Sequence, residues 1–435
     1  MSITQSFLQQ CQSVDFSNAN LQPEKQVKRW VIALSGGLDS MVTLDLASQL
    51  LPQNSIVALH VNHQLQSAAD DWQQFCEAQC IQRNIPLHSF KISVTSSSEQ
   101  QLRDARYQCF ENFLAAGDCL LFGHHANDQA ETVLFRLVRG AGTKGLSAMP
   151  VQRAIGKAML LRPLLQLARS SLEYYAEQQQ LNWIEDPSNQ SVDYDRNFIR
   201  HKVLSQLNGH WPKASEQIAL CAQTLAIEQQ LLADYLALDI QQISQDNVLD
   251  LAKWQQFESN KATELLRHWL IGICASHVSR KQLQRILQDV IASRSDSQGY
   301  CKIGAYTVKR FKQQLYVIKT DMVIEAWPVL SLQQQHYNLN QGSLSFNYHT
   351  QGISFKEGMY LQSKSEGMSI EVAGRGRKKL KKLFQEHAIA PWLRENWPLL
   401  MYKEAVVAVP GICICEGWLE QGQKKAYLSI DWHPL

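Results

Sequence analysis

A run of small residues follows the first strongly apolar stretch of the chain. Val31–Leu34 are four apolar residues in succession, which predict a buried strand of a parallel sheet, and Ser35–Gly37 then predict a tight turn. Glycine lets the backbone come close to a ligand, and the N–H groups that start the next helix attract anions. The sequence therefore predicts a phosphate site here, with the carboxylate of Asp39 placed to hold Mg²⁺ on the phosphates.

The motif in this loop narrows the chemistry. It matches neither G-x-x-x-x-G-K-[ST] nor G-x-G-x-x-G, and a Gly-Gly turn by itself is most often only a turn. The run SGGLDS, however, resembles the SGGxDS loop of the PP-loop ATP pyrophosphatases, which split ATP between the α- and β-phosphates and activate a carbonyl-type oxygen as an adenylate. The resemblance implies that ATP is bound by Ser35, Gly36, Gly37, Leu38, Asp39 and Ser40.

A second polar stretch, GHHANDQAET at 123–132, also follows an apolar run. We expect a helix from about 128 to 139, with Asn127 as its N-cap. Asp128 and Glu131 then share one face of its first turn. These carboxylates either complement the helix dipole, or bind Mg²⁺ and orient or deprotonate a substrate amine. The residues alone leave both interpretations open.

The apolar runs alternate with helical segments. The expected strands are 31–34, 55–63, 86–92 and 119–125, and the expected helices between them include 67–83 and 98–117, the latter with Ser98 as N-cap. This alternation is typical of a doubly wound, parallel α/β sheet of the Rossmann-like kind, in which ligands bind at the carboxyl ends of the strands. We therefore expect His63, Gly123 and His124 to join the phosphate loop in one site.

Length and charge limit the classes of protein. A chain of 435 residues is too long for one core, so two or three domains are expected, and a net charge of only +2 means that nucleic-acid binding depends on local patches. The sequence has no apolar run of about 18 residues and no signal-peptide pattern, so neither a membrane partner nor secretion is expected. A cytoplasmic protein with reduced cysteines is predicted.

Three domains are expected. Residues 1–213 form the PP-loop domain, the Leu- and Gln-rich residues 214–320 form a mostly helical domain closed by a hairpin at 300–318, and residues 321–435 form a small α+β domain. The last of these carries a dense basic run above an apolar helix face, which is better explained by phosphate binding than by solvation alone. Its cations are Arg375, Arg377, Lys378, Lys379, Lys381 and Lys382.

Further motifs make the resemblance specific. HHANDQAET, RGAGTKGL, RPLL at 162–165, WIEDPSN at 183–189 and RNFIR at 196–200 occur in the order found in the tRNA(Ile)-lysidine synthetase family. HVNHQL at 60–65, RDARY at 103–107 and the segment 378–398 are also similar, so that the resemblance spans nearly the whole chain. It implies that ATP, with Mg²⁺, adenylates O2 of the wobble cytidine of tRNA(Ile) with a CAU anticodon. The ε-amine of free L-lysine then displaces AMP to give lysidine, which reads AUA instead of AUG.

The resemblance also implies roles for residues. Catalysis would involve Asp39, Asp128, Glu131, Arg106 and Arg196, with Asp39 and Asp128 as metal ligands. ATP would also contact His63, Gly123 and His124, and tRNA would contact Lys144, Arg200 and the six cations of the basic run. Guanidinium groups suit phosphates or the lysine carboxylate, although each arginine equally suits an ordinary ion pair. No DNA partner is expected.

Two other functions stand as alternatives. A PP-loop tRNA thiolase needs a catalytic or cluster-binding cysteine, commonly in a CxxC pair, and Cys76, Cys80, Cys109 and Cys119 lack that spacing. A non-catalytic tRNA-binding protein with a degenerate nucleotide fold is the second alternative. The intact SGGLDS and HHANDQAET motifs argue against it.

Overall fold

The computed structural model divides the chain into two compact units, Met1–Asp234 and Tyr235–Leu435. It describes residues 2–16, 26–64, 66–92, 99–187, 191–192, 195–276, 278–293, 299–320, 326–328, 330–331, 335–364, 367–421 and 427–434. Leu65, Ser98, Ser188 and Asn189, which belong to the motifs and to the helix expected above, lie outside these residues. The three-domain division at 213 and 320 stays a prediction.

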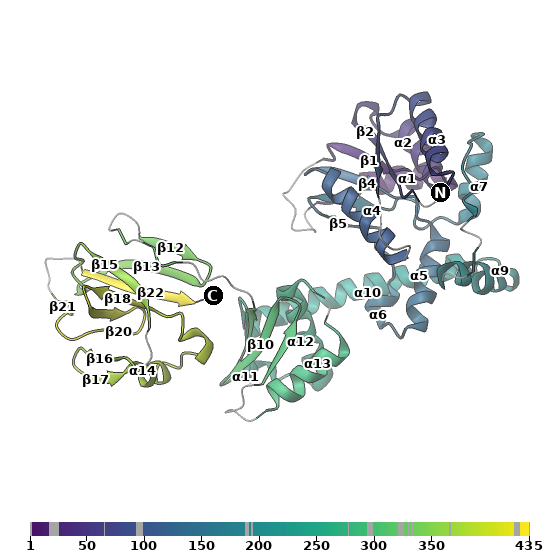
Figure 1. The fold of residues 1–435 in the computed structure, drawn as a ribbon. Helices are drawn as coiled ribbons and strands as arrows, with labels where there is room; N and C mark the ends of the chain where they lie inside the picture. Colours follow the sequence, from purple (N-terminus) through teal and green to yellow (C-terminus); the bar gives the residue numbers. More distant parts are fainter. Residues whose placement is uncertain are drawn as a thin grey trace. The chain divides into compact units, whose positions relative to one another are not determined.

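One six-stranded sheet organises the first unit (Figure 1). Its strands are β1 (Arg29–Ala33), β2 (Ile56–Asn62), β3 (Leu87–Lys91), β4 (Asp118–Leu121), β5 (Gln152–Ile155) and β6 (Ala158–Leu161). The order is β3-β2-β1-β4-β6-β5, and every neighbouring pair is parallel except β5 with β6. The expected α/β sheet is confirmed, and an antiparallel edge strand makes it mixed rather than purely parallel.

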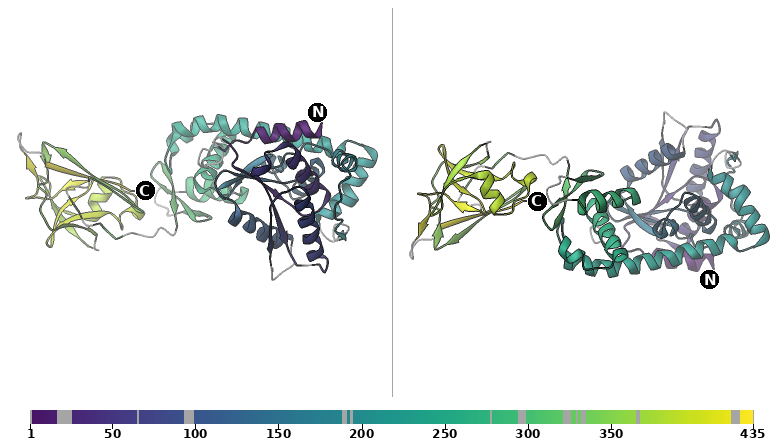
Figure 2. Two further views of the ribbon diagram at one scale, coloured as in Figure 1. Left: turned by 90° about the horizontal axis from the view of Figure 1, so that it is seen from above. Right: turned by 90° about the horizontal axis from the view of Figure 1, so that it is seen from below.

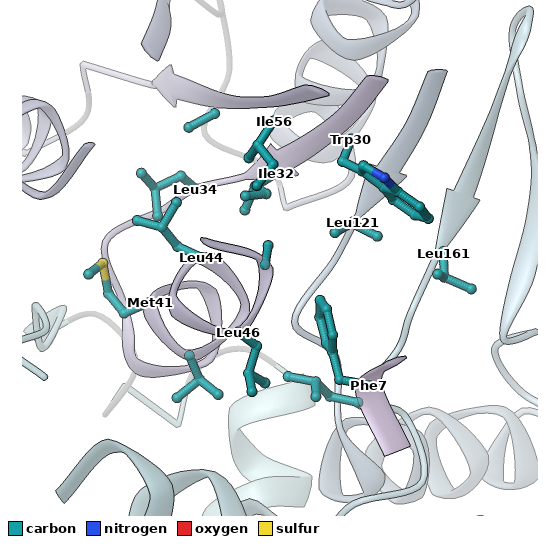
Figure 3. Close-up of a cluster of buried hydrophobic side chains, with 14 of the residues drawn as sticks. Phe7, Trp30, Ile32, Leu34, Met41, Leu44, Leu46, Ile56, Leu121 and Leu161 are labelled. Carbon is teal, nitrogen blue, oxygen red and sulfur yellow. The ribbon is translucent and has the colours of Figure 1, made fainter. Parts of the chain in front are cut away.

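Helices cover both faces of this sheet. The side chains of β1 point alternately to the two faces, and apolar side chains on each face pack against the helices. Trp30 and Ile32 belong to one core with Phe7 and Leu44 (Figure 3). Val31 belongs to a second core on the opposite face of the sheet. The helices of the unit are α1 (Ile3–Gln12), α2 (Leu38–Leu50), α3 (Ala69–Gln82), α4 (Glu99–Phe113), α5 (Ala126–Val138), α6 (Thr143–Leu146), α7 (Arg169–Gln178), α8 (Asp195–Phe198) and α9 (Ser205–His210), with the 3₁₀ turn η2 (Gln53–Ser55) and the π-helical segment η4 (Ile199–Leu204).

The strand order creates a crevice between β1 and β4. From β1 the chain adds β2 and β3 on one side, then returns to place β4 on the other side of β1. Loops that leave two neighbouring strands in opposite directions open a space at their carboxyl ends, where α/β proteins bind ligands. The two motif loops, at 34–37 and 122–125, follow these two strands.

The helix after β4 begins earlier than its sequence suggests. The N-cap of α5 is His125, whose ring Nδ1 accepts a hydrogen bond from the backbone N–H of Asn127 at 3.2 Å. Asp128 completes a capping box, since its Oδ2 accepts from the backbone N–H of His125 at 3.0 Å. The prediction of Asn127 as N-cap is therefore wrong, because the ring nitrogen takes the role that the amide oxygen was expected to fill.

The second unit contains two separate hydrophobic cores. The first, within 236–317, joins α11 (Leu251–Trp254), α12 (Ser259–Cys274), α13 (Arg280–Arg285) and the π-helical η5 (Ile286–Ile291) to a five-stranded antiparallel sheet. The expected hairpin is part of that sheet, which consists of β7 (Ser244–Gln245), β8 (Val248–Asp250), β9 (Tyr300–Ile303), β10 (Tyr306–Phe311) and β11 (Gln314–Lys319). The long helix α10 (Ala214–Ile243) is unbroken (Figure 2) and contains the boundary between the units.

The second core, within 330–432, belongs to short strands and one helix. The strands are β12 (His336–Leu339), β13 (Gly342–His349), β14 (Gln351–Gly352), β15 (Met359–Ser363), β16 (Ser369–Val372), β17 (Gly376–Lys379), β18 (Pro398–Tyr402), β19 (Ala405–Val409), β20 (Cys413–Ile414), β21 (Glu420–Gln421) and β22 (Tyr427–Pro434), with helix α14 (Leu380–Glu386) and the 3₁₀ turn η6 (Pro391–Leu393). Leu380, Leu383 and Phe384 are buried, as the apolar helix face requires.

Gly123 gives a test of the packing between the two motif loops. A Cβ at this position would lie 2.4 Å from the backbone oxygen of Asp39 and 2.8 Å from Thr43 Oγ1, so the first turn of α2 would have to move. We expect Gly123→Ala to lower the free energy of unfolding by about 2 kcal/mol, measured by urea unfolding.

Gly209→Ala is the matched control. Gly209 lies in α9 with nothing within 4 Å of its built Cβ, so alanine there should leave stability unchanged or raise it. Equal stabilities of the two variants would show that the contact at Gly123 relaxes without cost.

Candidate active site

The loop after β1 is held in shape by the side chain of Ser40. Its Oγ accepts from the backbone N–H groups of Ser35 at 3.2 Å and Gly36 at 3.1 Å, and donates to the oxygen of Gly37 at 2.9 Å. Gly36 has φ +87°, and its oxygen accepts from the N–H of Ile184 at 2.9 Å. The N-cap of α2, Gly37, makes no side-chain capping bond, so the N-terminus of this helix is open to an anion.

This loop lines a cavity of about 510 Å³ at the carboxyl ends of β1, β2 and β4. Several residues predicted for the site share that cavity wall. They are Ser35, Gly37, Asp39, Ser40, His63, Arg106, Gly123, His124 and Asp128. The lining also joins the loop after β2 to the 183–186 segment, because Gln66 Nε2 donates to Asp186 Oδ1 at 2.9 Å and both residues line the cavity.

Buried polar atoms at the site that have no hydrogen-bond partner among the described residues include His63 Nδ1, Asp39 Oδ1 and His125 Nε2. Asp39 Oδ1 and His125 Nε2 lie 3.6 Å apart. Because Nδ1 of His125 accepts the capping bond, Nε2 carries the ring proton and faces the carboxylates of Asp39 and Asp128, the latter at 3.5 Å. Asp39 therefore keeps one buried oxygen unused by the protein, which is the donor that a divalent cation needs.

Behind this wall, Arg200 joins the two carboxylates of α5. Its Nε and Nη2 bind the two oxygens of Glu131 at 2.5 and 3.1 Å, and Nη2 also lies 3.3 Å from Asp128 Oδ1. Arg200 comes from the π-helical segment η4, which packs on α5 around Ala130. The prediction that Arg200 contacts tRNA is untested, and in this structure its guanidinium is engaged by protein carboxylates.

Burial and neighbouring charges shift the pKa values of Asp128 and Glu131 in opposite directions. Burial raises the pKa of Glu131, although the bidentate contact with Arg200 opposes it. Burial also favours the neutral form of Asp128, but His125, its backbone N–H and Arg200 outweigh burial, so the pKa of Asp128 is lowered. Asp128 is thus the permanent charge of the pair, and Glu131 is closer to accepting a proton.

A buried arginine fixes the ring of His124. Arg162 Nε donates to His124 Nδ1 at 3.1 Å and Nη1 donates to the oxygen of Pro150 at 2.7 Å. Burial lowers the pKa of His124 to about 3, so the ring is neutral and presents a protonated Nε2. His125 and Arg162 were absent from the predicted site residues, although the HHANDQAET and RPLL motifs contain them.

Other predicted residues do not line the cavity. Gly36, Leu38, Glu131, Arg196, Lys144 and Arg200 belong to the first unit but are not among the lining residues. In the second unit the basic run does not lie on one helix, because Arg377, Lys378 and Lys379 belong to β17, which pairs with β16. Arg375, Arg377, Lys379, Lys381 and Lys382 are exposed, whereas Lys378 is half-buried and binds Glu386 at 2.6 Å.

The cysteines do not offer a thiol nucleophile to the cavity. No cysteine is among the described residues that line it. Cys76 packs beside Gly36, but burial raises the pKa of its thiol to about 12. A thiol with that pKa stays protonated at neutral pH and is a poor nucleophile, which argues against the thiolase alternative.

The carboxylate–arginine cluster predicts a pH-dependent stability. In Arg200→Gln, Glu131 is left charged, 4% exposed and unpaired, so the free energy of unfolding at pH 8 should fall by about 2 kcal/mol, a value reduced because Arg200 is itself 31% exposed. Without the arginine the folded-state pKa of Glu131 rises further above its unfolded value. The deficit should therefore shrink as the pH falls through that raised pKa, measured by urea unfolding from pH 8 to pH 5.

Arg169→Gln serves as the control because it breaks an exposed pair with Glu173 and should change stability by no more than about 0.5 kcal/mol at either pH. A deficit for Arg200→Gln that is the same at pH 8 and pH 5 would contradict the assignment of the charge to Glu131.

Three sequence profiles match successive parts of the chain. The PP-loop domain profile matches residues 10–207, the TilS substrate binding domain profile matches residues 249–316, and the TilS substrate C-terminal domain profile matches residues 360–432. Among the described residues, none of the helices combines the length and apolar character that a membrane crossing requires.

Relatives match over nearly the full length. The tRNA(Ile)-lysidine synthase of Vibrio vulnificus strain YJ016 is 36% identical over 422 residues, which covers 93% of this chain and 97% of that protein. The tRNA(Ile)-lysidine synthases of Enterobacter sp. strain 638 and Pseudomonas aeruginosa strain PAO1 are 37% and 34% identical, covering 93% and 95% of this chain and 96% and 95% of those proteins. The chain therefore belongs to the tRNA(Ile)-lysidine synthase family, the ligases that form lysidine at the wobble position of tRNA(Ile) with ATP.

Proposed function

We propose that ATP binds in the cavity of the first unit with its pyrophosphate on the loop after β1, and that it adenylates O2 of the wobble cytidine of tRNA(Ile) with a CAU anticodon. The observation that carries this proposal is the open N-terminus of α2, next to the unpartnered Asp39 Oδ1 in a cavity of about 510 Å³. Helix N–H groups stabilise the negative charge that gathers on the departing pyrophosphate.

Mg²⁺ fits beside this loop through Asp39. Magnesium in nucleotide sites takes one or two carboxylates and completes its shell with phosphate oxygens and water. Asp39 offers a buried oxygen without a protein donor, whereas both oxygens of Asp128 already accept from His125 and Arg200. Asp39 is thus the better supported of the two predicted ligands, and when bound the ion would neutralise charge on the phosphates.

Free L-lysine is assigned to the acidic side of the cavity. Asp128 lines the cavity as a charged carboxylate and can hold the incoming ammonium group. Attack needs the neutral amine, so a base must take its proton, and Glu131 is the acid whose pKa burial raises. We propose that the amine takes the place of Arg200 at these carboxylates. Arg106 on the cavity wall and Arg196 on α8 would serve the lysine carboxylate or the phosphates.

His124 would supply a neutral hydrogen-bond donor at the same wall. Its ring cannot become cationic at neutral pH because burial holds its pKa near 3, so it donates to an anionic oxygen without adding charge. The two other predicted functions are less well supported. A thiolase needs a reactive thiol, and no cysteine is among the described residues that line the cavity. A protein that only bound tRNA would not need a buried carboxylate oxygen without a hydrogen-bond donor, as Asp39 Oδ1 is.

Mass spectrometry of tRNA(Ile) after incubation with ATP and labelled lysine tests the reaction. Wild type should add one lysine, and Asp39→Asn should lose ATP–pyrophosphate exchange by at least about a hundredfold while keeping its fold, because an isosteric amide removes the charge that holds the metal. Asp71→Asn, an exposed acid in the first turn of α3, is the control and should exchange normally. A sulfur-containing product, or no product, would refute the proposal.

The basic run should bind tRNA phosphates through its exposed cations. Changing Arg375, Arg377, Lys379, Lys381 and Lys382 together to Gln should leave ATP binding intact and weaken tRNA binding. Each lost phosphate contact lowers the slope of log K against log salt by about 0.7 to 0.9, so three or four contacts change it by about 2 to 4.

Lys378→Gln gives the contrast within the same run, because this lysine is already paired with Glu386 and should hardly change the slope. Affinity is measured against potassium concentration for wild type and both variants. Parallel lines with equal intercepts would show that the run is only a solvated surface.

A further inference from the structure

Three arginines gather at Tyr107 beside the cavity. The guanidinium carbons of Arg103 and Arg153 lie 5.2 and 5.1 Å from the centre of the Tyr107 ring, and Arg162 interacts electrostatically with the same residue. They come from three places in the chain: α4, the edge strand β5, and the end of β6. The Tyr107 ring stacks at 5.9 Å and 23° on Phe122, which lines the cavity, so the cluster adjoins the cavity wall.

None of these three arginines forms an ion pair with a described carboxylate. Arg153 Nη1 donates to the oxygen of Ala154 at 3.1 Å, and Arg162 donates only to neutral acceptors. Other arginines of the unit do find carboxylates, as Arg29 does with Asp118 and Arg83 with Asp45. The guanidinium groups of the cluster also disfavour one another, since Arg153 and Arg103 lower the pKa of Arg162 beyond the effect of its burial.

An uncompensated cationic cluster is stabilised by an anion. Arg103 and Arg153 are half-buried, so their positions are already restricted, and a guanidinium fork matches the two free oxygens of a phosphodiester. The phosphates of ATP belong to the loop after β1 in the function proposed above. The cluster lies on the other side of β4, at the β6-β5 edge of the sheet. An anion there therefore belongs to a ligand that reaches the cavity from that edge.

We propose that Arg103 and Arg153 bind a phosphodiester of the tRNA next to the nucleotide that enters the cavity, with Arg162 and Tyr107 holding them in place. This assignment rests on the proposed function, because it needs an RNA substrate at this cavity. The carboxylate of free lysine is an alternative source of the same oxyanion chemistry, and the experiment separates the two.

Arg103→Gln and Arg153→Gln each remove one guanidinium, and Lys157→Gln is the matched control. Lys157 is exposed in the turn between β5 and β6, at the end of β6 away from the cavity, and its loss changes the net charge equally. Lysidine formation is measured against tRNA, ATP and lysine in turn, and tRNA affinity against potassium concentration. Each Gln variant should raise the KM for tRNA about tenfold and lower the salt slope by about 0.7 to 0.9, with the KM values for ATP and lysine unchanged. Lys157→Gln should change none of these.

The other outcomes are decisive too. A raised KM for lysine alone would assign the cluster to the amino-acid carboxylate and overturn the RNA contact. A lowered Tm with an unchanged KM for tRNA and an unchanged salt slope would show that the arginines only stabilise the fold through cation–π contacts, and would overturn the proposal. If a Gln variant does not fold, the same measurements are made on Arg103→Lys and Arg153→Lys, which keep the positive charge but lose the two-pronged guanidinium. The proposal then requires a raised KM for tRNA together with an unchanged salt slope. Wild-type lysidine formation, measured alongside, tests the proposed function separately.

Discussion

The active side of the first unit depends on a backbone contact between α2 and the loop after β4. The first turn of α2 lies against Gly123, where a Cβ would come within 2.4 Å of the Asp39 oxygen, so that helix and loop approach without a side chain between them. This contact brings residues 85 to 91 positions apart in the sequence to one cavity wall, with Gly37 and Asp39 on one side and His124 and Asp128 on the other. An open helix N-terminus and a set of titratable groups thereby share one space.

The charged groups in and beside this cavity fall into two sets, one near the phosphate loop and one on α5. Nearest the phosphate loop, Asp39 keeps an oxygen that has no hydrogen-bond donor among the described residues, and His125 Nε2 lies 3.6 Å from that oxygen. In the first turn of α5, Asp128 lines the cavity and pairs with Arg200, which also pairs with Glu131 behind the lining residues. Buried carboxylates without such a partner would take up protons instead of holding charge, so Arg200 favours the charged form of both acids. In the function proposed above, the amine of the substrate takes the place of Arg200.

Apolar runs and glycines predicted the sheet, the phosphate loop and the position of the crevice, because those signals are local. The N-cap of α5 could not be found this way, since Asn127 is the better cap by residue type and the ring of His125 takes the role only when it is buried behind Asp39. The partner of Arg200 was equally hidden, as 69 residues separate it from Glu131. In the basic run, positive φ at Gly374 and Gly376 turns the chain into a hairpin that composition alone does not reveal.

A cation that is already paired with a carboxylate of the protein is better suited to a structural role, and an unpaired one to binding an anion. This distinction separates the two roles more sharply than residue type does. Arg200 and Lys378 stand in motifs that suggest RNA, yet both are matched by carboxylates of the same unit. Arg103 and Arg153 stand beside an aromatic ring with no described counter-ion, and so do more to attract a polyanion than their modest exposure suggests. A chain with a net charge of only +2 cannot attract tRNA by its total charge. In the two proposals made above, the cations that attract tRNA are those beside Tyr107 and those on the exposed β17–α14 segment.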